Sequence, residues 1–137
     1  MFPGTTKILI VDDMSTMRKF IRNCLAGVGL TNCFEAHDGN SAWAQLEAAA
    51  ALNMPFELLV TDWNMPNMKG IDLLKKVRAN PKMTRMPVMF VTAETTMAQV
   101  REAIEAGATH YIVKPFSPEV FQEKLGKVYA FYAAQKK

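Results

Sequence analysis

Three acidic residues, a threonine and a lysine stand at the ends of apolar runs in the sequence. Asp12 and Asp13 follow KILIV, Asp62 follows ELLVT, Thr92 closes PVMFVT and Lys114 follows THYIV. If these runs are parallel strands, the five side chains arrive at one edge of a sheet. Two carboxylates ~5 Å apart repel by roughly 3 kcal/mol at an effective dielectric of ~20, so three of them need a cation. Mg²⁺, which accepts carboxylates, carbonyl oxygens and waters and bridges to phosphate, is the cofactor that this set predicts.

The lysine and the threonine indicate which ligand would bind beside the cation. Lys114 offers a compact positive charge for a phosphoryl oxygen, and Thr92 offers a hydroxyl donor. Phosphoryl transfer depends mainly on positioning and charge neutralisation, and a carboxylate can act as the nucleophile that forms an acyl phosphate. Asp62 follows the central run and is therefore the candidate phosphoacceptor.

Each of these residues has a simpler interpretation when it is taken alone. The Asp12-Asp13 pair could be a solvated loop that caps a helix, and Asp62 could cap another helix. Tyr111 could be a half-buried strand aromatic, and Trp63 could be a core residue. The joint arrival of the acids, the hydroxyl and the lysine favours the phosphoryl site. We then expect Trp63 to border that site and to report its occupancy by fluorescence.

Short apolar runs alternate with helical patterns along the chain. Five strands are predicted, at 7–11, 33–36, 57–61, 87–92 and 109–113. The two runs at 57–61 and 87–92 are nearly continuous in apolar residues, which is typical of strands covered on both faces. Parallel strands need crossover helices, and the crossovers are right-handed. The sequence therefore predicts an α/β fold, a doubly wound five-stranded parallel sheet with helices on both faces.

Apolar residues at helical spacing fill the intervals between the predicted strands. They mark five helices, at Met17 to Val28, Ala42 to Ala51, Ile71 to Val77, Met97 to Ile104 and Phe121 to Tyr132. Ser117-Pro118 is typical of a helix start. Gly29 and Gly107 are candidates for left-handed helix ends. Residues 1–6 are expected to be a short flexible lead-in.

Length and composition favour one domain over residues 1–137. The net charge is +3 and the basic residues are dispersed, which argues against nucleic acid as a partner. No apolar run approaches the ~20 residues of a membrane span, and no signal-peptide pattern begins the chain. Cys24 and Cys33 have no metal-site spacing, and we interpret both as reduced thiols. We expect a cytoplasmic monomer with no membrane contact.

Five stretches of the sequence resemble the receiver domain of response regulators, and most of all its stand-alone chemotaxis members: VDDMSTMRK, TDWNMPNMKG, VTAE, AGA and YIVKPF. The resemblance implies a flavodoxin-like (βα)5 fold with strand order 2-1-3-4-5. It implies that a histidine kinase phosphorylates Asp62, and that Asp12, Asp13, Asp62 and the backbone carbonyl of Asn64 hold Mg²⁺. Because alternation along a strand aims adjacent side chains differently, we expect Asp13 to ligate the metal directly and Asp12 through water. The Lys114-Pro115 bond is expected to be cis.

The resemblance also implies a switch, and a signalling role rather than an enzymatic one. Thr92 and Lys114 would bind the phosphoryl oxygens, Thr92 would move toward the phosphate, and Tyr111 would swing inward behind it. Asn64 and Glu94 flank the site as in the chemotaxis members, which implies fast dephosphorylation and a dedicated phosphatase.

The output is expected to be a surface that other proteins read, because no second domain is expected. The resemblance places this surface on the fourth helix, the fifth strand and the fifth helix. Its residues here are Thr95, Thr96, Met97, Val100, Ile104, Tyr111, Val113, Lys124 and Lys127. The expected partner is the flagellar motor switch protein.

Some features depart from the chemotaxis members and leave alternatives open. TTM begins the fourth helix where lysines are typical, Lys69 replaces an acid, and the second helix is longer. One alternative is therefore a phosphate sink or phosphorelay intermediary that does not bind the motor. Another is a Mg²⁺-dependent phosphohydrolase that acts through an aspartyl phosphate. The second is disfavoured because its general acid–base position holds Asn64 and no cap domain encloses a substrate.

Overall fold

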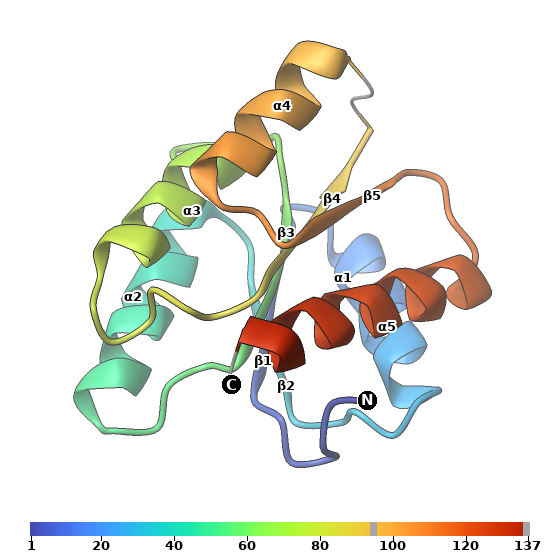
Figure 1. Ribbon diagram of the computed structural model, residues 1–137, viewed down its shortest axis with the longest axis horizontal. Helices are drawn as coiled ribbons and strands as arrows, with labels where there is room; N and C mark the ends of the chain where they lie inside the picture. Colours follow the sequence, from blue (N-terminus) through green and yellow to red (C-terminus); the bar gives the residue numbers. More distant parts are fainter. Residues whose placement is uncertain (94–95, 136–137) are drawn as a thin grey trace.

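Strands and helices alternate along the whole chain, in a computed structural model that describes residues 1–93 and 96–135. The elements are β1 (Ile8–Val11), α1 (Ser15–Ala26), β2 (Cys33–Ala36), α2 (Gly39–Ala51), β3 (Leu58–Asp62), α3 (Gly70–Ala79), β4 (Val88–Thr92), α4 (Met97–Ala106), β5 (His110–Val113) and α5 (Pro118–Gln135). The five predicted strands and five predicted helices are confirmed (Figure 1).

The strands form one parallel sheet in the order β2-β1-β3-β4-β5. The predicted doubly wound fold and its strand order are therefore correct. In the sheet register Val11 pairs with Thr61, and Asp62 pairs with Val91. Thr92 pairs with Val113. The carboxyl ends of neighbouring strands among β1, β3, β4 and β5 thus differ by at most one residue, and the polar residues at or after these ends arrive together.

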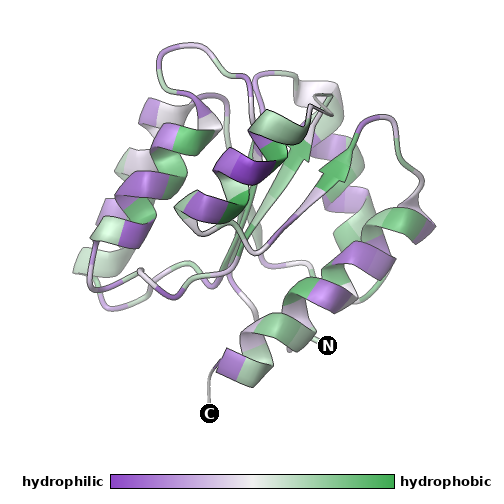
Figure 2. Cartoon of the chain, turned by 45° about the horizontal axis from the view of Figure 1, so that its top comes forward, coloured by the Kyte–Doolittle hydropathy of each residue, from purple (hydrophilic) through white to green (hydrophobic). Residues whose placement is uncertain are grey.

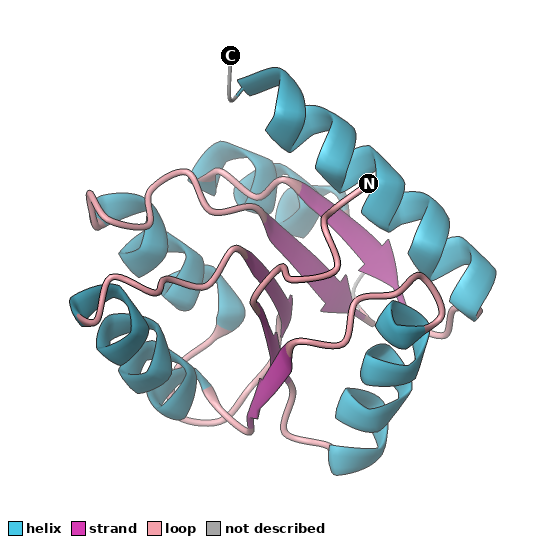
Figure 3. Cartoon of the chain, turned by 90° about the horizontal axis from the view of Figure 1, so that it is seen from below, coloured by secondary structure: helices cyan, strands magenta, loops and turns pink. Residues whose placement is uncertain are grey.

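Two layers of helices cover the sheet, with α1 and α5 on one face and α2, α3 and α4 on the other (Figures 1 and 3). Strand alternation divides the core between these faces. Leu9, Leu59 and Phe90 pack on the α2–α3–α4 side. Ile10 and Val60 pack on the α1–α5 side. The apolar colouring of the strands and the polar outer faces of the helices in Figure 2 follow from this arrangement.

Local sequence signals explain several of the helix ends. Ser117 precedes α5 and its hydroxyl accepts a hydrogen bond from the Val120 N–H at 3.2 Å, as predicted for a cap. Gly107 ends α4 in the left-handed conformation, and Gly29 also has a positive φ. The start of α2 differs from the prediction, because Asp38 caps the helix and lets it begin at Gly39 rather than near residue 42.

The prediction of a flexible lead-in at residues 1–6 is wrong. Phe2 is buried, with its ring centroid 4.9 Å from that of Tyr129 and 6.0 Å from that of Tyr132, both on α5. The Thr6 N–H donates to the Pro3 carbonyl at 2.9 Å and closes a turn. The ring contacts with α5 and this turn together hold the segment against the fold.

The two cysteines are not bonded to each other. Cys24 and Cys33 are free thiols, as predicted, and burial raises the pKa of both thiols. Among the described residues, no helix combines the length and apolar character needed to cross a bilayer.

Candidate functional site

Three carboxylates meet at the carboxyl edge of the sheet. Asp12 and Asp13 follow β1, and Asp62 is the last residue of β3. One oxygen from each carboxylate lies within 4.8 Å of the other two. Asp12 is fully buried, Asp62 is 7% exposed and Asp13 is exposed. The helix-cap interpretation of the pair does not hold, because Met14 is the N-cap of α1 and no side chain caps that helix.

Lys114 supplies the positive charge of this cluster. Its Nζ lies 3.2 Å from Asp12 Oδ2 and 3.4 Å from Asp62 Oδ2. A backbone hydrogen bond helps to fix its place, because the Lys114 N–H donates to the Thr92 carbonyl at 2.8 Å. The Lys114-Pro115 bond is cis, as expected. One lysine cannot neutralise three carboxylates, and an all-oxygen donor set of this kind fits a hard divalent cation such as Mg²⁺.

The electrostatics of Asp62 show the same charge imbalance. Burial raises the pKa of its carboxyl, Lys114 opposes that rise, and the Asp12 carboxylate adds to it. The ionised form of Asp62 is therefore under-stabilised by the protein alone. A cation or an added ligand with donors at this edge would relieve the imbalance.

The other predicted residues fall into three groups. Thr92 is buried at the end of β4, one residue beyond the partner of Asp62 in the sheet. Trp63 is buried beside Asp62, and Asn64 is exposed in the loop that follows. Glu94, together with Thr95 of the predicted surface, lies outside the described residues. The role of the Asn64 carbonyl as a ligand stays a prediction.

Arg18 supports the acidic loop, and sequence reasoning missed it. Its Nη1 donates to the Asp12 carbonyl at 2.6 Å and its Nε to Glu35 Oε1 at 2.9 Å. Arg22 binds the other oxygen of Glu35 and the Cys33 carbonyl, on the side away from the site. The only available signal was two arginines one helical turn apart after the acid pair, which is too common to identify a support.

If Mg²⁺ binds the three carboxylates, replacing Arg18 by methionine should weaken its binding about tenfold, because partners that orient metal ligands typically contribute 10–100-fold to affinity. The matched control is Arg22→Met, which loses the same kind of bond to Glu35 but none to Asp12. Calorimetric titration with Mg²⁺ measures both variants. Equal losses would mean that Arg18 acts only through Glu35.

A second unforeseen contact joins two loops beside the site. The Asn67 side chain, in the loop after β3, donates to Asp38 Oδ2 at 2.8 Å. The other oxygen of Asp38 accepts the Ser41 N–H at 2.7 Å in a reciprocal cap of α2. The Asp-x-x-Ser spacing was a readable cap signal. The hydrogen bond from Asn67 to Asp38 could not be predicted from the sequence, because it joins residues 29 positions apart.

Comparison with known proteins agrees with this geometry. The family model described as response regulator receiver domain matches residues 8–126. The chain belongs to the response regulator receiver domain family. It is 50% identical over 123 residues to the chemotaxis protein CheY of Pseudomonas aeruginosa, covering 90% of this chain and 95% of that protein. It is 47% identical over 119 residues to the chemotaxis protein CheY1 of Helicobacter pylori J99, covering 87% and 93% of the two.

Solved structures show the same relationship. The chemotaxis response regulator CheY4 of Vibrio cholerae superposes on this receiver domain with a TM-score of 0.80 and 32% identity, covering 90% of this chain and 98% of that one. A CheY-like receiver domain protein from Methanospirillum hungatei gives a TM-score of 0.79 and 27% identity, covering 94% and 98%. The chain is thus a CheY-like receiver domain of a response regulator of two-component chemotaxis signalling.

The predicted partner surface of the receiver domain is largely accessible where the structure describes it. Thr96, Met97, Ile104 and Lys127 are exposed, and Val100, Tyr111, Val113 and Lys124 are half-buried. Met97 and Ile104 expose 74% and 62% of their surface, large fractions for apolar side chains. The edge strand β5 lies between α4 and α5 (Figure 1).

His110 of β5, on this surface, makes the free energy of unfolding of the protein depend on pH. Burial lowers its pKa, and Lys124 and Lys127 lower it further. An unfolded histidine titrates near ~6.5, so the unfolded chain binds this proton first as the pH falls. The stabilising contribution is complete above about pH 6.5 and is lost as the pH falls toward the lower pKa of the folded state.

His110→Asn should therefore lose less free energy of unfolding than the wild type between about pH 7 and about pH 5. Urea titrations at the two pH values measure the loss. An unchanged loss in His110→Asn would contradict the prediction.

Proposed function

We propose that this receiver domain is a Mg²⁺-dependent phospho-switch in which a histidine kinase phosphorylates Asp62. The observation that carries the proposal is the cluster of three carboxylates within 4.8 Å with Lys114 at 3.2–3.4 Å from two of them. A carboxylate oxygen of Asp62 attacks the phosphorus of phosphohistidine, the P–N bond breaks, and its electron pair leaves with the imidazole. The product is an acyl phosphate at the end of β3.

The remaining residues hold charge and geometry. Asp12, Asp13, Asp62 and the Asn64 carbonyl would hold Mg²⁺, which supplies neutralisation of the charge on the transferred group. The Lys114 ammonium binds one phosphoryl oxygen, for which it must leave part of its present contact with Asp62. Thr92, one residue beyond the sheet partner of Asp62 on β4, donates its hydroxyl to another phosphoryl oxygen.

The output is a change in the surface formed by α4, β5 and α5, and its partner is the flagellar motor switch protein. Support comes from the chemotaxis relatives and from the exposed Met97 and Ile104. At the start of α4 the exposed residues among those described are Thr96, Met97 and Ala98, and none of them is charged. This favours one further candidate, a phosphate sink that uses the same site without reaching the motor. Phosphate-enhanced binding to a peptide from the motor switch protein would exclude a pure sink.

Incubation with Mg²⁺ and acetyl phosphate tests the site. The wild type should gain the mass of one phosphoryl group, and Asp62→Ala should gain none. Removal of Mg²⁺ with a chelator should also abolish uptake. Asp72→Ala, which removes an acid from the first turn of α3, is the control and should take up phosphate as the wild type does. Uptake by Asp62→Ala at the wild-type level would overturn the assignment.

A further inference from the structure

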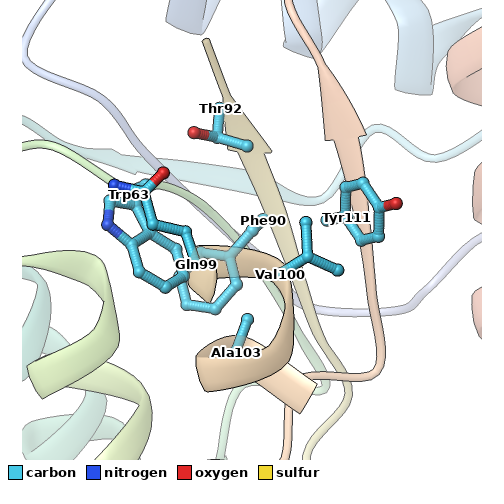
Figure 4. A pocket seen from close by; sticks show the side chains of 7 residues that line it. All are labelled: Trp63, Phe90, Thr92, Gln99, Val100, Ala103 and Tyr111. Atoms are coloured by element: carbon cyan, nitrogen blue, oxygen red, sulfur yellow. The ribbon is translucent and has the colours of Figure 1, made fainter. Parts of the chain in front are cut away.

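A small cavity lies between the candidate phosphorylation site and helix α4. It is lined by Trp63, Phe90, Thr92, Gln99, Ala103 and Tyr111, among others, and has a volume of about 10 Å³ (Figure 4). Trp63 directly follows Asp62, and Thr92 ends β4 beside it. The cavity therefore shares two walls with the site.

Gln99 brings an unusual polar atom to this cavity. Among residues 1–93 and 96–135, its buried side-chain oxygen Oε1 has no hydrogen-bond partner. A buried acceptor without a donor costs free energy, because it has lost water and gained nothing in exchange. A water molecule is a poor remedy here, because a buried water needs two to four polar partners and aromatic and aliphatic carbon makes up most of the lining.

Besides Gln99, three side chains that line the cavity carry a hydrogen-bond donor: Trp63, Thr92 and Tyr111. The Trp63 ring is packed against Phe90 with centroids 5.0 Å apart, which holds it in place. The Thr92 hydroxyl is the proposed donor to a phosphoryl oxygen. Tyr111 is half-buried on the edge strand β5, and its hydroxyl points away from the other labelled side chains in Figure 4. Tyr111 is the donor with freedom to turn.

We propose that Gln99 is a positioning residue of the switch, whose Oε1 accepts a hydrogen bond from the Tyr111 hydroxyl when Asp62 is phosphorylated. The inference rests on the proposed function. A cavity of about 10 Å³ holds little more than one water-sized group, so the tyrosine ring enters only when a wall moves. Thr92 is that wall, since its hydroxyl is drawn toward a phosphoryl oxygen.

The bond would transmit the signal to the partner surface. Gln99 lies in the first turn of α4, and its N–H donates to the Thr96 hydroxyl that caps the helix at 3.3 Å. A bond from Tyr111 to Gln99 therefore ties β5 to the turn that displays Thr96 and Met97. It buries the tyrosine ring and satisfies the unpaired oxygen in one movement.

The experiment uses protein labelled with 3-fluorotyrosine and fluorine NMR. The chain has three tyrosines, and Tyr111→Phe assigns the resonance of Tyr111. Mg²⁺ with beryllofluoride serves as the phosphoryl mimic, and its bound fluorines report occupancy in the same spectrum. In the wild type the Tyr111 resonance should move to a second position when the mimic binds.

Gln99→Met keeps the length of the side chain and removes the acceptor. At full occupancy by the mimic, its population at the second position should fall at least about fivefold, which corresponds to about 1 kcal/mol of lost coupling. Gln99→Glu retains an acceptor and should recover part of that population. Arg101→Met, on the exposed side of the same helix, should behave as the wild type does.

Thermal unfolding without Mg²⁺ or mimic gives an independent readout. Gln99→Met should be at least as stable as the wild type there, because it removes an unpaired buried acceptor. A residue that only supports the fold would instead lower the midpoint.

The outcomes separate the two proposals. If the wild type binds no beryllofluoride, the proposed function and this inference both fail. If the mimic binds and the Tyr111 resonance moves equally in Gln99→Met, this inference fails and the phospho-switch stands. If Arg101→Met loses the second population as strongly as Gln99→Met does, the effect belongs to the helix in general and the role of Gln99 is excluded.

Discussion

Asp13→Asn should weaken Mg²⁺ binding about 100-fold, and phosphorylation of Asp62 should fall with it. Loss of a partner that only orients a metal ligand already costs 10–100-fold, and Asp13 is proposed as a direct ligand. Its carboxylate is one of three whose oxygens lie within 4.8 Å. Because Asp13 is exposed, asparagine should fit there without strain. The free energy of unfolding without Mg²⁺ should therefore stay level or rise slightly, since one repulsive charge is gone.

Asp12→Asn should differ from Asp13→Asn, because it should lower the free energy of unfolding without Mg²⁺. The Asp12 carboxylate is fully buried, accepts the Met14 N–H at 2.9 Å through Oδ1 and meets the Lys114 ammonium at 3.2 Å through Oδ2. An amide retains one of these contacts at most. We expect a loss of about 2 kcal/mol in the free energy of unfolding without Mg²⁺, because charged hydrogen bonds to buried groups contribute about that much.

Fluorescence of Trp63 during Mg²⁺ titration, in a Trp43→Phe background that leaves one tryptophan, measures the affinity. Urea titration without Mg²⁺ measures the stability. Asp72→Asn, on the exposed surface of α3, is the control for a general change of charge. The assignment of Asp13 as a direct ligand fails if Asp13→Asn binds Mg²⁺ as tightly as that control.

Gly70→Ala should destabilise the protein by about 3 kcal/mol, near the upper end for forced overpacking. A Cβ atom at Gly70 would collide with the backbone carbonyl of Asp62 and would stand 2.8 Å from a ring carbon of Phe90. The Gly70 N–H also donates to the Trp63 carbonyl at 2.9 Å. The backbone of α3 is thus packed directly on the strand end that carries Asp62, and relief of the collision must move either α3 or that strand end.

Gly126→Ala is the matched control for this prediction. Gly126 lies inside α5, where an added Cβ would meet nothing within 4 Å. Alanine there should raise the free energy of unfolding by about 0.5–1 kcal/mol through helix propensity. Chemical denaturation compares the variants, and phosphoryl uptake from acetyl phosphate reports the position of Asp62. Wild-type stability and uptake in Gly70→Ala would mean that α3 can retreat from β3 at little cost.

The fold and the place of the candidate site could be predicted from the sequence alone, because both depend on local and repeated signals. Neighbouring residues alone show the local signals: apolar runs of strand length, helical periodicity and helix caps such as Ser117. Parallel strands joined by right-handed crossovers leave few topologies. Polar residues at strand ends must then share one edge, and this constraint alone groups Asp12, Asp62 and Lys114.

The residues that support that site could be identified only from the three-dimensional structure. Arg18 donates to the backbone carbonyl of Asp12, and the Asn67 side chain donates to Asp38, 29 positions away in the sequence. The Phe2 ring packs against Tyr129 of α5. The unpaired oxygen of Gln99 could not be read from the sequence either, because an unpaired atom is defined by everything packed around it. Such contacts depend on side-chain placement in three dimensions, whereas sequence spacing records only which element a residue occupies and which face it shares.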